Sequence, residues 1–560
     1  TSNKLGTNVE VPLNDTIPII FVPGIMGSNI FNKALGKPVW MLGNGAGIAK
    51  TLFQQMNKSP AILQKELDYL NTEVDKSGTI KVDSRIKLSE KDLREKRFWG
   101  TVHWDSYGGI LTYLESVLNR VDLKGNAMYG GGSMGGMLDG FGAIKNMTDN
   151  PIIEWQSILK SAEQKTWHPQ ETFTNVTQQD IEHLKAFHFP VYAMGYNWLQ
   201  SSEDGAKIVS GKLDVIKKGL GGRFHKFIVV THSMGGLLTR RLVQLREDIA
   251  GVVHGVMPAE GAPAAYRRIV SGSGDVGAIP AYVLGKNTEH VTAVLANAPG
   301  GLELLPSKVY NEGKPWLFLK GTGYQGERDI ELNEVRLPKS DPYEEIYKAD
   351  GVWWEMVKAE LIDPAGMVKS NNPGKRVKDV YFKKIEKVKE FHDLISNKYH
   401  PCTYANYGHD SKYSSFGTLT WTLDQALRGL TTQQMKNLPR VSAQEVDAYN
   451  QKIAKDAMYM GQGAVYYMKT NMKQNNELRY IKLTNGKFGT FKISEKNADG
   501  DGTVPWQSGS APLKQIGVKQ IFKMKGFDHQ FSYNNIQVRR SVLYSIVQII
   551  KENNIQPKYR

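Results

Sequence analysis

The sequence predicts an α/β fold, in which helices flank a mostly parallel sheet. Short apolar runs at 17–22, 225–231 and 252–256 have the near-continuous hydrophobicity of strands that are buried on both faces. A further strand signal at 189–196 and a helical pattern at 202–220 make strand and helix alternate along the chain. Because a parallel pair of strands needs a long crossover connection, this alternation favours parallel pairing.

The first strand ends in a turn that is punctuated by glycine. Residues 17–22 (Ile-Pro-Ile-Ile-Phe-Val) lead directly into 23–28 (Pro-Gly-Ile-Met-Gly-Ser). Weakly periodic sequence follows over about 35–150, except for a helical stretch at 106–119. We therefore predict that residues 1–257 form the first part of the core, with an insertion over about 35–150.

The alternation fades over 258–475, where prolines, charges and helical segments predominate. This change predicts a large, mostly helical cap or lid insertion. Its clearest helix, 376–398, repeats apolar residues at three-to-four spacing among many lysines, which fits a solvated face over a core stripe or, alternatively, a membrane-facing helix. Strand signal returns at 518–524 and a closing helix follows at 538–550, so we assign 476–560 to the second part of the core.

The chain has 560 residues, a formal net charge of +15 and a single cysteine, Cys402. The charge favours an anionic partner, but it does not choose between nucleic acid and a phospholipid surface. One cysteine excludes an intramolecular disulfide and a multi-cysteine metal site. No run of about 18 apolar residues exists, and residues 1–12 lack the pattern of a signal peptide, so we expect neither a membrane span nor a leader.

The segment 231–236 (Thr-His-Ser-Met-Gly-Gly) places Ser233 between an apolar strand and a leucine-rich helix. A sharp turn of this kind, a nucleophile elbow, exposes the serine Oγ above the sheet edge. The N-terminus of the following helix then faces developing negative charge. We predict that Ser233 is a nucleophile and that the Met234 N–H is an oxyanion donor.

A serine nucleophile needs a base and an orienting carboxylate, and both follow in the order serine, aspartate, histidine. The turn at 499–505 (Asp-Gly-Asp-Gly-Thr-Val-Pro) offers Asp501, with Asp499 as the alternative, and His529 follows the last predicted strand. We predict that His529 removes the Ser233 proton and that Asp501 orients the imidazole.

A second oxyanion donor is expected from the turn after the first strand. The Ile25 N–H is the favoured donor, and Met26 is the neighbouring alternative. A competing motif at 131–135 (Gly-Gly-Ser-Met-Gly) fits the bare G-x-S-x-G string better than 231–236 does. No apolar strand precedes Ser133 and no sustained helix follows it, so we interpret this segment as a glycine loop.

No spacing of histidines and carboxylates matches a metal site. We therefore predict no required cofactor and no metal, and leave a calcium site near the acidic turns as the alternative. His232, His254 and His392 are each interpreted as structural residues.

The segments 22–28, 231–236 and 499–505 together resemble lipases of the α/β-hydrolase fold, in the broad group that contains lecithin:cholesterol acyltransferase-like and GPI-inositol-deacylase-like enzymes. Further segments resemble bacterial type VI secretion lipase effectors, namely 99–107, 195–198, 256–259 and 295–301. This second resemblance extends over roughly residues 15–305 and the C-terminal region with Asp501 and His529.

The resemblance implies an antibacterial phospholipase that is made in the cytosol without a signal peptide, loaded on the secretion spike protein and delivered into the periplasm of a rival bacterium. It implies membrane phospholipid as substrate, a cognate immunity protein as partner, and no nucleic acid. Two alternatives stay open. One is an esterase or acyltransferase acting on a smaller ester, and the other is a catalytically silent lipid-binding or partner-binding module on a hydrolase scaffold.

Overall fold

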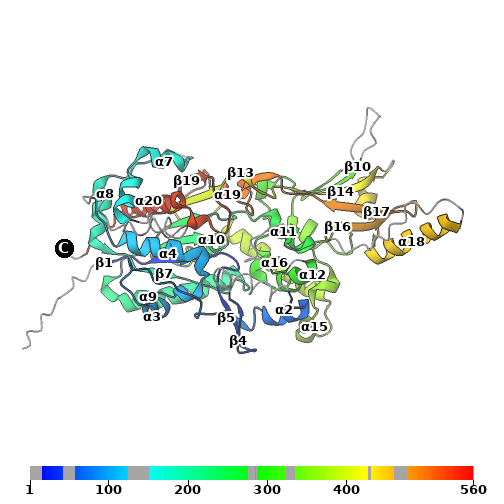
Figure 1. Cartoon of the computed structure of the whole chain (residues 1–560), viewed down its shortest axis with the longest axis horizontal. Helices are drawn as coiled ribbons and strands as arrows, with labels where there is room; N and C mark the ends of the chain where they lie inside the picture. The colour runs from blue at the N-terminus through cyan, green and yellow to red at the C-terminus, as the bar shows by residue number, and fades with distance from the viewer. Residues whose placement is uncertain are drawn as a thin grey trace, which may run out of the picture.

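The structure is a computed structural model that describes residues 15–41, 57–123, 150–170, 172–274, 284–285, 287–322, 334–426, 430–459 and 476–558. A parallel sheet with its helices lies at one end of an elongated arrangement, and a second sheet lies at the other end (Figure 1). The segment 131–135 with Ser133 lies outside the described residues.

The central sheet has six strands in the order β19-β12-β9-β8-β2-β7, and all of its neighbouring pairs are parallel. This arrangement confirms the predicted mostly parallel sheet of an α/β-hydrolase fold. The strands span β2 Ile19–Val22, β7 Val191–Ala193, β8 Phe227–His232, β9 Ile249–Gly255, β12 Thr403–Gly408 and β19 Val518–Met524.

Both faces of the central sheet are buried, and β2 shows how. Its alternate residues Ile19 and Phe21 join a core with the helices α4 (Trp104–Leu118) and α20 (Ile536–Glu552). Ile20 and Val22 join the opposite core with α9 (Ser202–Leu220) and α10 (Gly235–Leu242). Because side chains alternate between the faces of a strand, a strand covered on both sides is continuously apolar.

Strand β12 was not predicted, and it lies inside the expected insertion 258–475. Its sequence, Thr-Tyr-Ala-Asn-Tyr-Gly, has no β-branched run, yet all six residues are buried. The strand pairs with β9 on one side and with β19 on the other. Tertiary pairing therefore places a strand of the central sheet where composition gives no strand signal.

The second sheet also comes mostly from the region 258–475, with two strands from beyond it. Its order is β11-β10-β14-β17-β16-β15, and only the pair β10–β14 is parallel. The strands span β10 Leu317–Thr322, β11 Glu334–Leu337, β14 Leu419–Ala426, β15 Arg440–Val441, β16 Leu478–Lys482 and β17 Phe488–Ile493.

The predicted helix at 376–398 is α16, Val377–Ile395. Its apolar stripe packs into the core: Tyr381, Ile385, Val388, Phe391 and Ile395 are all buried. Lys383 and Lys387 of this helix are exposed, whereas Lys378 is buried and pairs with Glu355. The helix therefore fits the first of the two predictions, a solvated face over a core stripe. Among the described residues, no helix has the length and apolar character that a bilayer crossing requires.

The described residues also form smaller sheets and further helices. A three-stranded sheet is formed by β4, β3 and β5, and two-stranded pairs are formed by β1 with β6 and by β13 with β18. The remaining elements are β1 Asp15–Thr16, β3 Ile30–Asn32, β4 Lys37–Trp40, β5 Thr72–Val74, β6 Phe187–His188, β13 Asp410–Ser415, β18 Ala498–Gly500, α2 Pro60–Glu66, α3 Glu90–Glu95, α6 Pro151–Ile158, α7 Ser161–Thr166, α8 Gln178–His183, α11 Pro263–Ser271, α12 Thr288–Leu295, α13 Pro299–Leu302, α14 Ala359–Ile362, α15 Met367–Asn371, α17 Thr432–Lys436, α18 Ala443–Tyr459 and α19 Trp506–Gly509.

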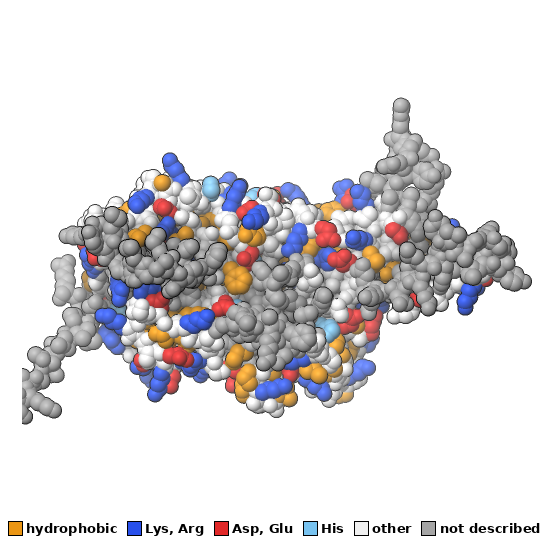
Figure 2. All heavy atoms as spheres, viewed as in Figure 1, with side chains coloured by type: hydrophobic (Ala, Val, Ile, Leu, Met, Phe, Trp, Pro, Cys, Tyr) orange, Lys and Arg blue, Asp and Glu red, His pale blue; other side chains and the backbone are white. Residues whose placement is uncertain are grey.

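Positive side chains are not gathered on the face seen in Figure 2. There, Lys and Arg are interspersed with Asp and Glu among the described residues. The net charge of +15 is therefore not concentrated in one patch on the described part of that face.

Candidate functional site

Ser233 lies in the sharp turn between β8 and α10. Its φ is 52°, in the left-handed region that non-glycine residues rarely adopt. Its N–H donates to the Gly255 carbonyl at 2.9 Å. The turn is closely packed, because a Cβ on Gly235 would lie 2.4 Å from the Pro23 carbonyl oxygen. Glycine at 235 is therefore what lets the helix start directly behind the serine.

His529 joins Ser233 to Asp501 by hydrogen bonds. Its Nε2 lies 2.8 Å from the Ser233 Oγ, and its Nδ1 lies 2.8 Å from the Asp501 Oδ2. The other Asp501 oxygen accepts the N–H groups of Thr503 at 3.0 Å and Val504 at 2.7 Å. Asp501 is 1% exposed, so its carboxylate is held by these three partners away from water. In addition, the His529 N–H donates to the Asp501 backbone carbonyl at 2.7 Å.

Of the two aspartates in the acidic turn, only Asp501 reaches His529. The Asp499 Oδ2 lies 3.6 Å from the Nε2 of a different histidine, His409, and the Asp499 side chain is 44% exposed. The structure thus brings together Ser233, His529 and the favoured aspartate, and leaves the alternative on the surface.

The N–H groups of the proposed oxyanion donors make no hydrogen bond in the part of the chain that the structure describes. Neither the Ile25 N–H nor the Met234 N–H donates to another group among the described residues, and the same holds for Met26. Ile25 and Met26 both line the pocket that contains Ser233. Met26 has a φ of 61°, and its carbonyl accepts the Trp40 Nε1–H at 2.9 Å.

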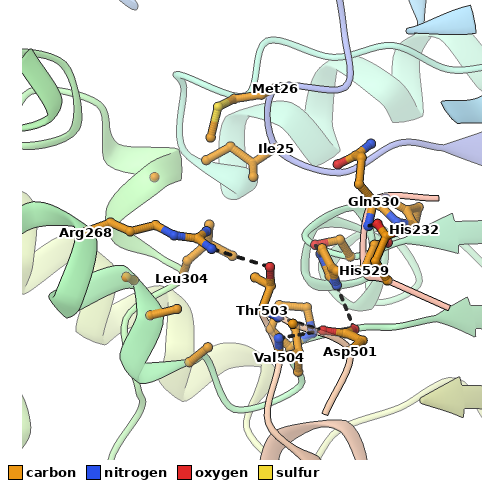
Figure 3. Close-up of a pocket in the computed structure, with 18 of the residues that line it drawn as sticks. Ile25, Met26, His232, Arg268, Leu304, Asp501, Thr503, Val504, His529 and Gln530 are labelled. Atoms are coloured by element: carbon orange, nitrogen blue, oxygen red, sulfur yellow. Dashed lines mark hydrogen bonds and ion pairs between the residues drawn. The ribbon is translucent and has the colours of Figure 1, made fainter. Parts of the chain in front are cut away.

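A pocket of about 200 Å³ opens onto Ser233 and His529 (Figure 3). It lies at the carboxyl ends of β2 and β8, the edge where open parallel sheets bind ligands. Helices α11 and α12, from the region 258–475, help to enclose it. Much of its lining is small or apolar, namely Ile25, Met26, Pro258, Ala262, Ala264, Ala265, Leu295, Gly301 and Leu304.

Two cations line the pocket beside the acidic turn. The Arg268 Nη2 lies 3.4 Å from the Thr503 Oγ1, and the Lys496 Nζ donates to the Gly502 carbonyl at 2.8 Å. Figure 3 shows Arg268 extending from α11 toward Thr503, with Asp501 and His529 beyond it. The pocket therefore combines a largely apolar lining with two cations near the acidic turn.

Comparison with known proteins bears on the fold as a whole. No protein-family model matches the sequence, and no curated protein matches it. Among solved structures, a chain of the Tle4-Tli4 complex is 28% identical and aligns with a TM-score of 0.71, covering 96% of this chain and 99% of that chain. This chain resembles Tle4. The match confirms the resemblance to type VI secretion lipase effectors that the sequence motifs indicated.

A second solved structure, phospholipase PlaB from Legionella pneumophila, covers 56% of this chain and 75% of that chain. It is 10% identical, with a TM-score of 0.15, which is too low a likeness to bear on the fold.

Sequence reasoning missed residues next to this site, and Tyr107 is one of them. Tyr107, from α4, is fully buried, and its hydroxyl lies 2.8 Å from the Nδ1 of His232. Its only sequence signal was its place in a segment of family resemblance, 99–107. His232 was interpreted as structural, and its buried ring does contact the site, because its Nε2 lies 2.8 Å from the His529 carbonyl oxygen.

The other two histidines are buried and bonded within the core. His254 Nδ1 lies 2.9 Å from the Thr231 hydroxyl, and His392 lies 2.6 Å from the Tyr343 hydroxyl. Burial also raises the pKa of the Cys402 thiol to about 12, which makes it a poor nucleophile. Within the described ranges, no group of three or more His, Cys, Asp or Glu residues could hold a metal ion.

Proposed function

We propose that this chain is a serine lipase or phospholipase that hydrolyses carboxylic ester bonds of membrane phospholipids through an acyl-enzyme. The observation that carries the proposal is the hydrogen-bonded series Ser233, His529 and Asp501 at the mouth of a largely apolar pocket. Hydroxyl, imidazole and carboxylate in this order form a nucleophile, a base and an orienting group.

In the first step, the His529 Nε2 accepts the Ser233 proton while the Ser233 Oγ bonds to the carbonyl carbon of the ester. The carbonyl oxygen becomes an oxyanion, which accepts hydrogen bonds from the Ile25 and Met234 N–H groups. The tetrahedral intermediate collapses with cleavage of the C–O bond, and His529 returns the proton to the departing alcohol. Asp501 stabilises the imidazolium in between.

In the second step, water replaces the alcohol. His529 removes a proton from water, the hydroxide oxygen bonds to the acyl carbon, and the Ser233 Oγ leaves with the proton. The products from a phospholipid are a free fatty acid and a lysophospholipid. No cofactor enters either step.

Three features support a lipid as the substrate. Small and apolar side chains make up much of the pocket lining, and they match an acyl chain. Two cations, Arg268 and Lys496, also line the pocket, and they match a phosphate. The structural neighbour Tle4, which aligns over 96% of this chain, has the same overall fold. We further propose that α11 and α12, which the region 258–475 supplies to the pocket, act as its cap.

The partners follow from the same resemblance. Tle4 is found in a complex with Tli4, so we propose a cognate immunity protein for this chain as well. We also propose that a type VI secretion spike protein carries the chain to the periplasm of a target bacterium, where phospholipid is present. An esterase or acyltransferase with a smaller ester substrate is the nearest alternative, because the same three residues would serve it.

The test is product analysis by mass spectrometry after incubation with vesicles of phosphatidylethanolamine and phosphatidylglycerol. The wild type should release fatty acid and lysophospholipid, while Ser233→Ala should release neither and still bind vesicles. Ser133→Ala, in the competing glycine-serine motif, is the matched control and should keep activity. Cleavage on the phosphate side, or full activity in Ser233→Ala, would reject the proposal. Hydrolysis of short soluble esters but of no vesicle lipid would favour the esterase.

A further inference from the structure

A series of buried hydrogen bonds connects the turn after β2 with the loop that carries His529. The Gly24 N–H lies 3.1 Å from the Tyr107 hydroxyl, which lies 2.8 Å from the His232 Nδ1. The His232 Nε2 in turn lies 2.8 Å from the His529 carbonyl oxygen. Tyr107 and His232 are 0% and 1% exposed, so water does not compete for the two bonds that the Tyr107 hydroxyl makes. We call Gly24, Tyr107, His232 and His529 the buried relay.

The chemistry of the groups determines which atom donates and which accepts in each hydrogen bond of the buried relay. A carbonyl oxygen only accepts, so the His232 Nε2 must carry a hydrogen. Burial lowers the pKa of His232 to about 3, so the ring is neutral at working pH and its Nδ1 is an acceptor. The Tyr107 O–H therefore donates to Nδ1. Its oxygen is left to accept the Gly24 N–H, and every buried donor in the series has its acceptor.

We propose that Tyr107 and His232 are positioning residues, which hold the oxyanion-binding backbone in alignment with the imidazole of His529. This inference rests on the proposed serine hydrolase function. At one end of the relay, the Gly24 N–H is already engaged, so it cannot serve an oxyanion. The bond orients the Pro23–Gly24 peptide unit and leaves the Ile25 N–H as the next donor along the turn.

At the other end, the backbone of His529 is held on both sides. Its N–H donates to the Asp501 carbonyl at 2.7 Å, and its carbonyl accepts from His232. The position of the imidazole relative to the Ser233 hydroxyl is thus set by main-chain bonds as well as by its side-chain partners. A rigid supporting shell of this kind is what keeps reacting groups within a fraction of an ångström.

Close packing removes the room in which the turn could shift. A Cβ on Gly24 would lie 3.0 Å from the His232 Nδ1, and a Cβ on Gly27 would lie 2.6 Å from the Tyr107 hydroxyl. The His232 ring also packs against the rings of Tyr107 and His529, each with a centroid separation of 5.2 Å. The turn after β2 therefore rests directly on the two side chains that we assign as positioning residues.

Tyr107→Phe is the sharpest test, because it removes one hydroxyl and leaves the ring. The Gly24 N–H and the His232 Nδ1 then lose their partner. With a water-soluble short-chain ester, we expect kcat to fall by about 10- to 100-fold while KM changes by less than about twofold, since the oxyanion forms only in the transition state. Tyr113→Phe is the matched control: Tyr113 is buried on the same helix, but its hydroxyl donates to Glu154 at 2.9 Å.

A second measurement distinguishes misaligned oxyanion donors from a general loosening of the fold. A thionoester develops charge on sulfur, which fits an oxyanion site poorly, so the ratio of ester to thionoester kcat reports how well the donors are placed. We expect this ratio to fall in Tyr107→Phe and to stay at the wild-type value in Tyr113→Phe. A wild-type kcat in Tyr107→Phe, or a lower kcat with an unchanged ratio, would overturn the inference.

His232 variants keep the inference testable if Tyr107→Phe does not fold. The amide nitrogen of His232→Gln can still donate toward the His529 carbonyl, whereas His232→Leu cannot. We expect kcat to decrease in the order wild type, Gln, Leu, and equal values for Gln and Leu would contradict the relay. Failure of the proposed function itself is distinguishable, because Ser233→Ala would then hydrolyse the soluble ester at the wild-type rate.

Discussion

Gly24 packs against Ser233 so closely that a Cβ on Gly24 would lie 2.9 Å from the Ser233 Cβ. The turn after β2 and the nucleophile turn after β8 are therefore in direct contact. This contact is possible because β2 and β8 are neighbours, with Val22 opposite Thr231 in the register. The separation between Ser233 and the proposed donor at Ile25 thus depends on the absence of a side chain at position 24.

Gly24→Ala should push these two turns apart. We expect kcat for a soluble ester to fall by roughly 10²- to 10³-fold, the loss typical of removing one oxyanion donor. Gly211→Ala in α9 is the control, because a Cβ there meets nothing within 4 Å, and this variant should keep its activity. Steady-state kinetics with both variants, after circular dichroism has shown that they are folded, makes the comparison. Equal activities would mean that the contact does not matter.

Asp501→Asn should abolish most activity while Asp499→Asn should not. An amide at 501 can hold the wrong tautomer of His529 and cannot stabilise the imidazolium, so kcat should fall by roughly 10⁴-fold. Asp499 lies on the surface near His409, and its variant should retain kcat within about twofold, as surface changes away from a site usually do. Steady-state initial rates with a chromogenic ester measure kcat for both variants. The reverse pattern would assign the orienting role to Asp499.

The parts of this site that the sequence predicted are those with a strong local signal. Strand β8 is a continuous apolar run that ends in a small-residue turn, and both features point to Ser233 without any long-range information. Likewise, β19 spans Val518–Met524, the range that was predicted from its local strand signal.

The parts that could not be predicted depend on contacts between distant segments. Tyr107 and His232 are 125 residues apart, and nothing in either local sequence indicates that they share a hydrogen bond. Strand β12 is stabilised by its neighbours β9 and β19 rather than by its own composition. Arg268 lies on α11 and lines a pocket that is completed by residues from distant segments, so no motif could mark it.

Arg268→Gln should reduce activity on phospholipid more than activity on a neutral lipid. The guanidinium lines the pocket beside Thr503 and would bind a phosphate with charge-assisted hydrogen bonds. Losing such a bond costs about 1.5 to 3 kcal/mol, so kcat/KM for phosphatidylglycerol should fall at least about tenfold. For diacylglycerol with the same acyl chains, we expect little change.

The control for this prediction is Arg241→Gln. Arg241 lies on α10, where its Nε pairs with Glu203 at 2.5 Å, and it does not line the pocket. Competition assays with both lipids in mixed micelles give the selectivity directly. If Arg268→Gln lowers both activities equally, the side chain supports the shape of the pocket and does not recognise phosphate.

Glu303 should make the stability of the fold depend on pH. Its two carboxyl oxygens each lie 3.0 Å from the Ser202 N–H, at the start of α9, and the side chain is 1% exposed. Burial raises the pKa of Glu303 to about 8, against about 4.3 in an unfolded chain. The folded state therefore keeps a proton that the unfolded state releases between these values.

The sign follows from this difference in bound protons. The contribution of Glu303 to stability is fully present below the unfolded pKa and is lost progressively as pH rises toward about 8. Over this range ionisation of Glu303 lowers the free energy of the unfolded state, while the folded state keeps its proton. Glu303→Gln is neutral in both states and escapes this loss. Its free energy of unfolding relative to wild type should therefore rise between pH 5 and pH 9, by about 2 to 4 kcal/mol.

Denaturant unfolding at pH 5, 7 and 9 measures this change. Glu312→Gln is the control: Glu312 is exposed, its pKa is lowered by Lys314, and its carboxyl is ionised in both states throughout this range. That variant should follow the wild type at all three pH values. If Glu303→Gln does the same, then Glu303 is ionised in the folded protein at pH 7, and the N-terminus of α9 with its Ser202 N–H stabilises the charge despite its burial.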